Sequence, residues 1–245
     1  NPRSEHIAST IGLKPLSSTR PIIYGPLMSD AIEPNAAPSA RTTVKRGANR
    51  ALYTSETVCE ILDAGVIAHV GVNTPDGPIV LPMAYGRDDD TIYIHGSVAN
   101  AMMRAGRSLD VCVTVTIVDG LVVARTPFHN SMNYRSVVIR GLASPVTDPV
   151  DQAEALKIIN DHLVPIWDTA RPPSDADYKQ TLVLSVPVAE ASAKIRGGDP
   201  IDDDVDVAGP HWAGVVPLTS TWGSLVDAAD LREGIDAPAA VAAMV

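Results

Sequence analysis

The strongest constraint on the fold is the run LDVCVTVTIV at residues 109–118. Valine or isoleucine stands at every second position from 111 to 117, with cysteine or threonine between them. A period of two predicts a β-strand with one packed face. Aromatic residues make up only 4% of the chain, so the core is expected to consist mainly of Val, Ile, Leu and Ala. That composition favours sheet.

Further strands are predicted on both sides of this run. The complete set of strand-like runs is 66–72, 79–86, 91–96, 109–118, 133–146 and 180–197. The turn sequences NTPDGP and RDDD separate the first three, which predicts an antiparallel meander. The alternation of strand and long helix that builds a parallel sheet is absent. We therefore predict a mainly β fold with short helices, a closed or nearly closed antiparallel barrel of about six strands.

Three helices are predicted between the strands. Helical spacing follows Ser55 and ends near Gly65, and an amphipathic segment at 148–165 is ended by its last residue, a proline. The third helix, 97–106, opens behind Ser97 as N-cap.

Composition limits the function classes. The 19 basic and 29 acidic residues give a formal charge of −10, so nucleic acid is not expected as a partner. No apolar run is long enough to span a membrane and the start lacks a signal-peptide core, so the expectation is a cytoplasmic chain with no membrane partner. Cys59 and Cys112 lack a CxxC spacing and are expected to be buried free thiols. The aspartate runs 88–90 and 202–204 are expected to be solvated turns.

The two ends of the chain differ from its centre. A chain of 245 residues fits one domain with appendages. Residues 1–40 contain six prolines, which predicts an extended arm. Residues 41–50 hold four basic and no acidic side chains, so this stretch is either a solvated linker or a contact for an anionic ligand.

Chemistry concentrates in three segments. A strand tip at His95 and Gly96 stands directly before helix amides, which can receive an anion. Strand alternation at 133–136 sends Asn133 and Arg135 to one face and the residues between and after them to the other. Lysine and arginine at 194 and 196 share a face if the last strand persists. Together these segments can hold a ligand with phosphates and a planar ring.

These segments resemble the flavin-nucleotide-binding split-barrel proteins, relatives of pyridoxamine 5'-phosphate oxidase and of the nitroimidazole-resistance proteins. The resemblance is carried by YIHGS, DGLVVAR, SMNYRSVVIRG and SAKIRGG in that order. It covers 41–217, which makes this the barrel domain and 218–245 a C-terminal tail. It implies a split β-barrel that forms a homodimer, with FAD or FMN at the subunit interface.

The cofactor-binding residues follow from the resemblance together with the local cations and aromatics. The expected set is Val80, Leu81, Pro82, Met83, Tyr85, His95, Gly96, Ser97, Asn100, Arg104, Tyr134, Arg135, Ser136, Lys194, Arg196 and Trp212. Residues 80–85 are implied to lie along the isoalloxazine, 95–97 to approach the phosphate, and 134–136 to close the groove. The alternative for Arg135 is a structural ion pair with an aspartate, and for Trp212 a packed core position.

The phosphate-binding helix departs from the family pattern. Where oxidase members have Ser-Arg-Lys, this chain has Ala99-Asn100-Ala101, followed by Arg104. Cations at 135, 194, 196 or 41–50 can compensate, and such a set suits the diphosphate of FAD as readily as the phosphate of FMN.

Histidines outside these segments bear on a second cofactor. His69 is expected in the core, whereas His129 and His211 lie in turn-like segments and are candidate axial ligands of a heme, with no other metal site expected. The predicted function is an oxidoreductase that passes hydride or electrons to a small planar acceptor, with no catalytic residue assigned. The alternative is a non-catalytic carrier or sensor that binds flavin, heme or both.

Overall fold

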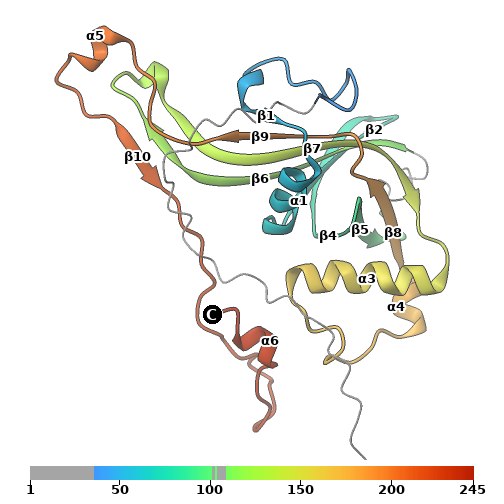
Figure 1. Ribbon diagram of the computed structural model, residues 1–245. Helices are drawn as coiled ribbons and strands as arrows, with labels where there is room; N and C mark the ends of the chain where they lie inside the picture. Colours follow the sequence, from blue (N-terminus) through green and yellow to red (C-terminus); the bar gives the residue numbers. More distant parts are fainter. Residues whose placement is uncertain (1–35, 101–102, 104–108) are drawn as a thin grey trace, which may run out of the picture.

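The computed structural model describes residues 36–100, 103 and 109–245 (Figure 1). Over these residues the strands are β1 (Ala51–Leu52), β2 (Ala68–Thr74), β3 (Gly77–Met83), β4 (Tyr85–Asp88), β5 (Thr91–Ser97), β6 (Leu109–Val123), β7 (Ser131–Pro145), β8 (Thr181–Pro187), β9 (Ala191–Arg196) and β10 (Gly214–Pro217). The helices are η1 (Ala48–Arg50), α1 (Ser55–Ala64), η2 (Pro127–His129), α3 (Pro149–Leu163), α4 (Asp175–Lys179), α5 (Asp204–Val207) and α6 (Ala239–Ala242).

The strands form one antiparallel sheet that does not close. Its order is β3-β2-β6-β7-β8-β5-β4, with β9 between β7 and β1, and β10 on β6. The ends of this order, β3 and β4, follow one another in the chain but do not pair. The fold is therefore a mainly β split barrel, as predicted.

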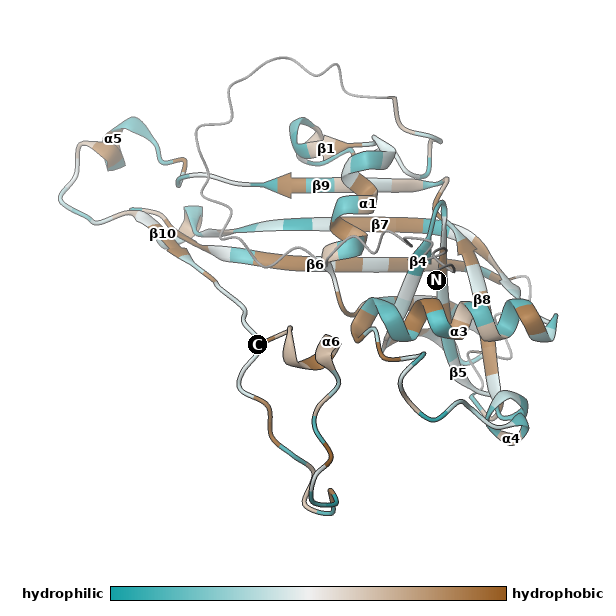
Figure 2. Cartoon of the chain, turned by 60° about the horizontal axis from the view of Figure 1, so that its bottom comes forward, coloured by the Kyte–Doolittle hydropathy of each residue, from teal (hydrophilic) through white to brown (hydrophobic). Residues whose placement is uncertain are grey.

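Helix α1 covers one face of the sheet. It begins at Thr54, whose hydroxyl oxygen accepts from the backbone N–H of Thr57 at 3.3 Å, so the N-cap is Thr54 rather than the predicted Ser55. Its buried residues Val58, Ile61 and Leu62 pack in the main core, over the strands β6, β7 and β9. Figure 2 shows that the hydrophobic residues run through the middle of β6 and β7.

Helix α3 covers β4 and β5, and a glycine permits its close approach. The Asp148 carboxylate accepts from the N–H of Val150 at 2.8 Å and caps the helix. A Cβ on Gly86 of β4 would lie 2.5 Å from the carbonyl oxygen of Ile158 in α3. Only a glycine fits at that contact without displacing the helix.

The longest element is the β6–β7 hairpin, and one residue changes its register. Val118 pairs with Tyr134 and Gly120 with Asn133, which leaves Asp119 as a bulge. Before the bulge the buried residues of β6 are odd-numbered, from 111 to 115; after it Gly120 and Val122 are buried. The ambiguous stretch 121–132 therefore contains the end of β6, η2 and the start of β7.

Several predicted elements differ from the observed ones. The run 79–86 divides into β3 and β4 around Ala84, and 180–197 divides into β8 and β9. The short strands β1 and β10 were not predicted, because two and four residues carry too little pattern. Most of the predicted helix 97–106 lies outside the described residues.

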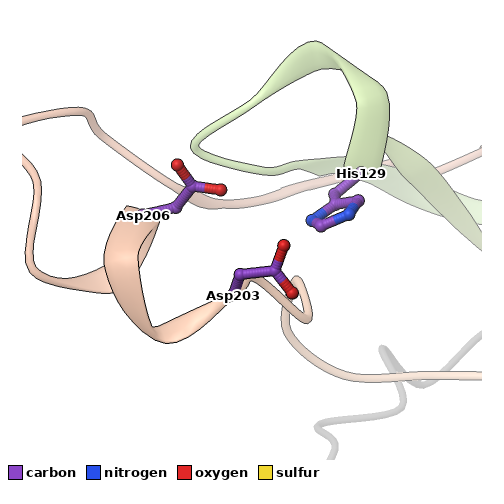
Figure 3. Close-up of side chains that lie close together, drawn as sticks. All are labelled: His129, Asp203 and Asp206. Atoms are coloured by element: carbon purple, nitrogen blue, oxygen red, sulfur yellow. The ribbon is translucent and has the colours of Figure 1, made fainter.

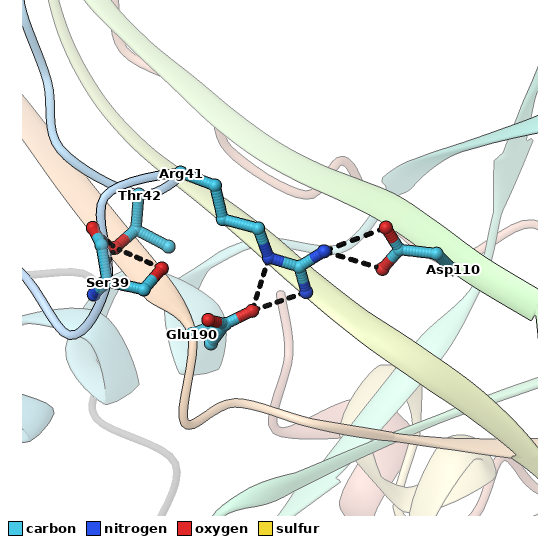
Figure 4. Close-up of polar contacts among 5 residues, drawn as sticks. All are labelled: Ser39, Arg41, Thr42, Asp110 and Glu190. Carbon is cyan, nitrogen blue, oxygen red and sulfur yellow. Dashed lines mark hydrogen bonds and ion pairs between the residues drawn. The ribbon is translucent and has the colours of Figure 1, made fainter.

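The segment of residues 39–42 is fixed to the sheet by Arg41 (Figure 4). Its Nη1 donates to both carboxylate oxygens of Asp110, at 2.9 and 2.7 Å, and its Nε and Nη2 contact Glu190. Thr42 is buried, and its hydroxyl donates to the Ser39 carbonyl at 2.9 Å. The boundary of the predicted arm at residue 40 remains a prediction.

The chain beyond β10 runs away from the sheet in both views (Figures 1 and 2). Every residue from Leu218 to Ala239 is exposed. Among the described helices, none is both long and apolar enough to cross a membrane.

Candidate functional site

The predicted cofactor residues are divided between the two faces of the sheet. The face opposite α1 is here called the open face. It carries three rows of paired residues: Pro82, His69, Thr114 and Val138; Thr116, Ser136 and Lys194; and Val118, Tyr134 and Arg196. Directly paired residues point to the same side of a sheet, so these rows share one face.

The open face is accessible on the strands near the sheet edge. Val80 of β3 is 61% exposed, and Pro82, His69 and Thr116 are exposed as well. The surface combines apolar side chains on β3 with hydroxyls on β6 and β7. Strand alternation predicted the placement of Tyr134 and Ser136 correctly.

Leu81, Met83 and Tyr85 point the other way, into or against the core. Tyr85 is fully buried and donates its hydroxyl to the backbone carbonyls of Leu62 and Gly65. Burial raises the pKa of Tyr85, with a smaller contribution from the Asp63 carboxylate. The expectation that Tyr85 lies along a cofactor ring is wrong for this chain.

Arg135 faces the α1 side and forms an ion pair with the bulge residue. Its Nη2 donates to Asp119 Oδ1 at 2.8 Å, and its Nε to both carboxylate oxygens at 3.1 and 3.2 Å. The alternative left open for Arg135, a structural ion pair, is what the structure contains. Its charge is balanced within the chain.

The cations of β9, unlike Arg135, bond to backbone carbonyls or to an amide side chain. Lys194 Nζ donates to the Arg46 carbonyl at 2.8 Å, because the pairing of β1 with β9 brings residues 46–51 beside it. Arg196 is 6% exposed and donates to Asn133 and to the carbonyls of Gly198 and Asp199. Among the described ion pairs, neither cation has a carboxylate partner.

Arg196 has a structural role, although the register places it beside Tyr134. Burial lowers the pKa of Arg196, and the Arg50 guanidinium nearby lowers it further. Its Nη1 and Nη2 donate to groups of the chain. Lys194 and Arg50 are therefore the more accessible cations at this end of the open face.

The tip of β5 forms a separate group. His95 Nδ1 is buried and, in the described part of the chain, has no hydrogen-bond partner. Burial lowers the pKa of His95. The Ser97 hydroxyl accepts from the N–H of Ala99 at 3.1 Å, and the Asn100 side chain accepts from Met103 at 3.4 Å. Arg104 lies outside the described residues.

A family model described as "Pyridoxamine 5'-phosphate oxidase" matches residues 54–195, more than half of the chain. The chain belongs to the pyridoxamine 5'-phosphate oxidase-like family. No curated protein matches it.

Solved members of this family include two that align over most of the chain. The flavocytochrome Anf3 from Azotobacter vinelandii is 38% identical, with a TM-score of 0.82, over 85% of this chain and 98% of that one. The FAD and heme binding protein from Mycobacterium smegmatis is 31% identical, with a TM-score of 0.76, over 80% and 97%. A 5-nitroimidazole antibiotic resistance protein from Bacteroides thetaiotaomicron, described as putative, is 24% identical with a TM-score of 0.50, over 59% and 86%, and supports the fold.

Three predicted site residues remain, Trp212, His211 and His129. Family membership assigns no role to them, and each has different surroundings. Trp212 is 67% exposed and its ring lies against Gly214, so it is not a core residue. His211 is exposed. His129 of η2 lies beside Asp203 and Asp206 (Figure 3). The neighbouring Asp202 side chain is buried, contrary to the expected solvated turn.

Two residues of the open face were assigned differently or overlooked in the sequence. His69 was expected in the core, but the register places it on the open face between Pro82 and Thr114. Thr114 was recognised only as a strand residue. The period-two pattern contained the signal for both, because each alternates with a buried valine or alanine. The pattern did not indicate which face of the sheet is left uncovered by helix α1.

Proposed function

We propose that this chain binds a flavin nucleotide on the open face, where a second copy encloses it, and acts as an oxidoreductase on a small planar acceptor. The observation that carries the proposal is the composition of this face. It brings together apolar residues of β3, hydroxyls of β6 and β7, and a cation of β9 that has no carboxylate partner among the described residues. Such a surface fits a ligand with a flat ring at one end and phosphates at the other.

The ring end is supported by residues that the sheet already holds in place. Val80 and Pro82 offer exposed apolar surface at the edge strand. Thr114, Ser136 and Tyr134 offer hydroxyls that can donate to or accept from the edge of an isoalloxazine. None of these side chains has to leave the core to contact the ring.

The phosphate end is supported by Lys194. Its Nζ uses one hydrogen on the Arg46 carbonyl and retains two donors. Arg46 and Arg50 lie on the segment that β1 anchors to β9, so the basic stretch is brought to the same end. More than one cation at this end favours a diphosphate, and hence FAD over FMN.

Bound flavin supplies hydride and single-electron transfer. The residues of the open face would bind the flavin, orient its ring on the sheet and exclude water from that side. No acid or base is assigned, because a bound flavin would carry the redox chemistry itself.

A second copy is needed to cover this surface. Apolar side chains remain exposed along β3 and the distal part of the β6–β7 hairpin, including Val80, Leu121 and Met132. Burial of such residues is the usual basis of a homodimer interface. The cofactor would then lie between the copies.

The second candidate function is a flavin and heme carrier or sensor. It is favoured by the two aligned structures described by their names as a flavocytochrome and as an FAD and heme binding protein. Of the two predicted axial histidines, His211 is exposed, whereas His129 is next to carboxylates. His211 is the candidate that we prefer.

The test is the absorption spectrum of the purified protein, with chromatography of the cofactor released by acid. Flavin bands are expected, and the released nucleotide distinguishes FAD from FMN. Anaerobic reduction followed by addition of a quinone separates the two functions, since an oxidoreductase is reoxidised at a rate that depends on quinone concentration. A colourless protein that takes up no flavin on titration would contradict the proposal. A Soret band lost in His211→Ala would support the heme assignment.

A further inference from the structure

Three potential metal ligands meet at the tip of the β6–β7 hairpin. His129 comes from η2, Asp203 is the N-cap of α5, and Asp206 lies within that helix. One ligand atom of each side chain lies within 4.8 Å of the other two. Figure 3 shows the two carboxylates and the imidazole directed toward a common point.

The segment that carries Asp203 is fixed to the hairpin that carries His129 by Asp202. Asp202 Oδ1 accepts from the backbone N–H of Arg125 at 3.0 Å, and Oδ2 accepts from the Arg125 guanidinium at 2.9 Å. The Asp202 side chain is 1% exposed. The carboxylates of α5 are therefore held beside the hairpin rather than on a free loop.

A separate observation concerns the imidazole of His129. Its Nδ1 is buried and, within the described structure, has no hydrogen-bond partner. The nearest carboxylate oxygen given for it, Asp202 Oδ1, is 3.9 Å away, beyond hydrogen-bond distance. The side chain as a whole is 24% exposed, and an ion bound at the cluster would satisfy the imidazole.

We propose that His129, Asp203 and Asp206 bind one divalent transition-metal ion, with zinc as the best match. One imidazole nitrogen and two carboxylate oxygens form a typical zinc or manganese ligand set, which leaves further positions to water. Calcium is disfavoured, because it takes six to eight oxygen ligands. The three aspartates of the run 202–204 therefore have different roles. Asp202 is buried in an ion pair, Asp203 is a ligand, and Asp204 is solvated.

The ion joins two segments that are distant in sequence. It links η2 to the connection between β9 and β10, at residues 197–213. It thereby supports the position from which β10 pairs with β6. The proposal does not depend on the flavin.

The experiment is calorimetric titration of zinc into chelator-treated full-length protein, with and without flavin. We expect one zinc ion per chain, and binding at least about tenfold weaker in Asp206→Asn and Asp203→Asn. Asp204→Asn, an exposed aspartate of the same helix outside the cluster, is the matched control and is expected to bind as the wild type does. Circular dichroism of each variant verifies folding.

Thermal unfolding gives a second measurement. Zinc is expected to raise the Tm of the wild type and of Asp204→Asn but not of Asp206→Asn, and calcium is expected to raise none of them. Absence of saturable zinc binding would overturn the proposal. So would equal affinities in Asp206→Asn and Asp204→Asn, since zinc would then be bound elsewhere on the surface. Loss of heme but unchanged zinc affinity in His129→Gln would overturn it as well, in favour of an axial role.

Discussion

The hydroxyl of Tyr85 donates to the carbonyl oxygen of Leu62 and so joins β4 to the last turn of α1. The Gly65 carbonyl lies at 3.1 Å from the same oxygen, and the ring of His162 in α3 packs on the tyrosine ring at 4.7 Å. One buried side chain therefore connects α1, α3 and the sheet.

Tyr85→Phe is expected to lower the free energy of unfolding by about 1–3 kcal/mol, because buried carbonyls lose their donor. Urea denaturation measures the change. Tyr93→Phe is the control, since no hydrogen bond from Tyr93 is found in the described structure. An equal loss of stability in both variants would show that the hydroxyl of Tyr85 is unimportant.

Stability is expected to decrease as the pH falls below about 6.5, the ordinary pKa of histidine. Burial lowers the folded-state pKa of both His95 and His162, so the unfolded chain binds more protons in this range. The stability that these groups contribute is present above the unfolded pKa and is lost as the pH falls toward the folded pKa. Unfolding free energies at a series of pH values should show a smaller slope in the double variant His95→Gln/His162→Gln. His211→Gln, at an exposed position, should keep the wild-type slope.

Gly86→Ala is expected to destabilise the fold by about 1–3 kcal/mol, because the new methyl would lie 2.5 Å from the Ile158 carbonyl. Amide hydrogen exchange should rise along α3. Gly223→Ala is the matched control, because no atom of the described residues lies within 4 Å of the added Cβ. Unchanged protection of α3 in Gly86→Ala would mean that the helix can shift at little cost.

Flavin affinity is expected to depend on Lys194 and not on Arg135. Lys194→Met removes a charge-assisted hydrogen bond to phosphate and should weaken binding about ten- to a hundredfold in a fluorescence titration of flavin-free protein. Arg135→Gln breaks the pair with Asp119 and should lower stability while flavin affinity is retained. The reverse result would place the phosphate beside Arg135.

Arg41→Gln is expected to increase amide exchange around residues 39–44, because the contacts with Asp110 and Glu190 anchor that segment. Raising the salt concentration should have the same effect on the wild type. Lys45→Gln is the control, as Lys45 forms no ion pair among those described. Equal exchange in all three proteins would show that the ion pairs of Arg41 do not anchor the segment.

The fold could largely be predicted because alternation persists over long strands. The central run around Val113 and the helix ended by Pro165 both appear near their predicted places. The division at Ala84 could not be predicted, since the residues on both sides are equally suited to strands. Whether β3 and β4 pair with each other or with distant partners depends on long-range contacts.

The candidate site could be predicted only in part. Alternation separated Tyr134 from Arg135 correctly, but sequence alone does not show which face is covered by α1. For the same reason His69 was expected in the core, whereas the position of Tyr85 at the site was implied by the family resemblance. The partner of Arg135 depends on the bulge at Asp119, which leaves no mark in a local pattern.

That bulge also determines how the hairpin can change in length. Asp119 acts as a one-residue insertion in β6. Odd-numbered residues face the core before it, and even-numbered residues face the core after it, toward the tip that carries His129. Replacement of Asp119 by alanine would remove a charge, whereas its deletion would turn Val122 outward and Leu121 inward. Homologous hairpins should therefore gain or lose residues here in pairs, or at the tip, and a single deletion at 119 should be tolerated far less well than any substitution there.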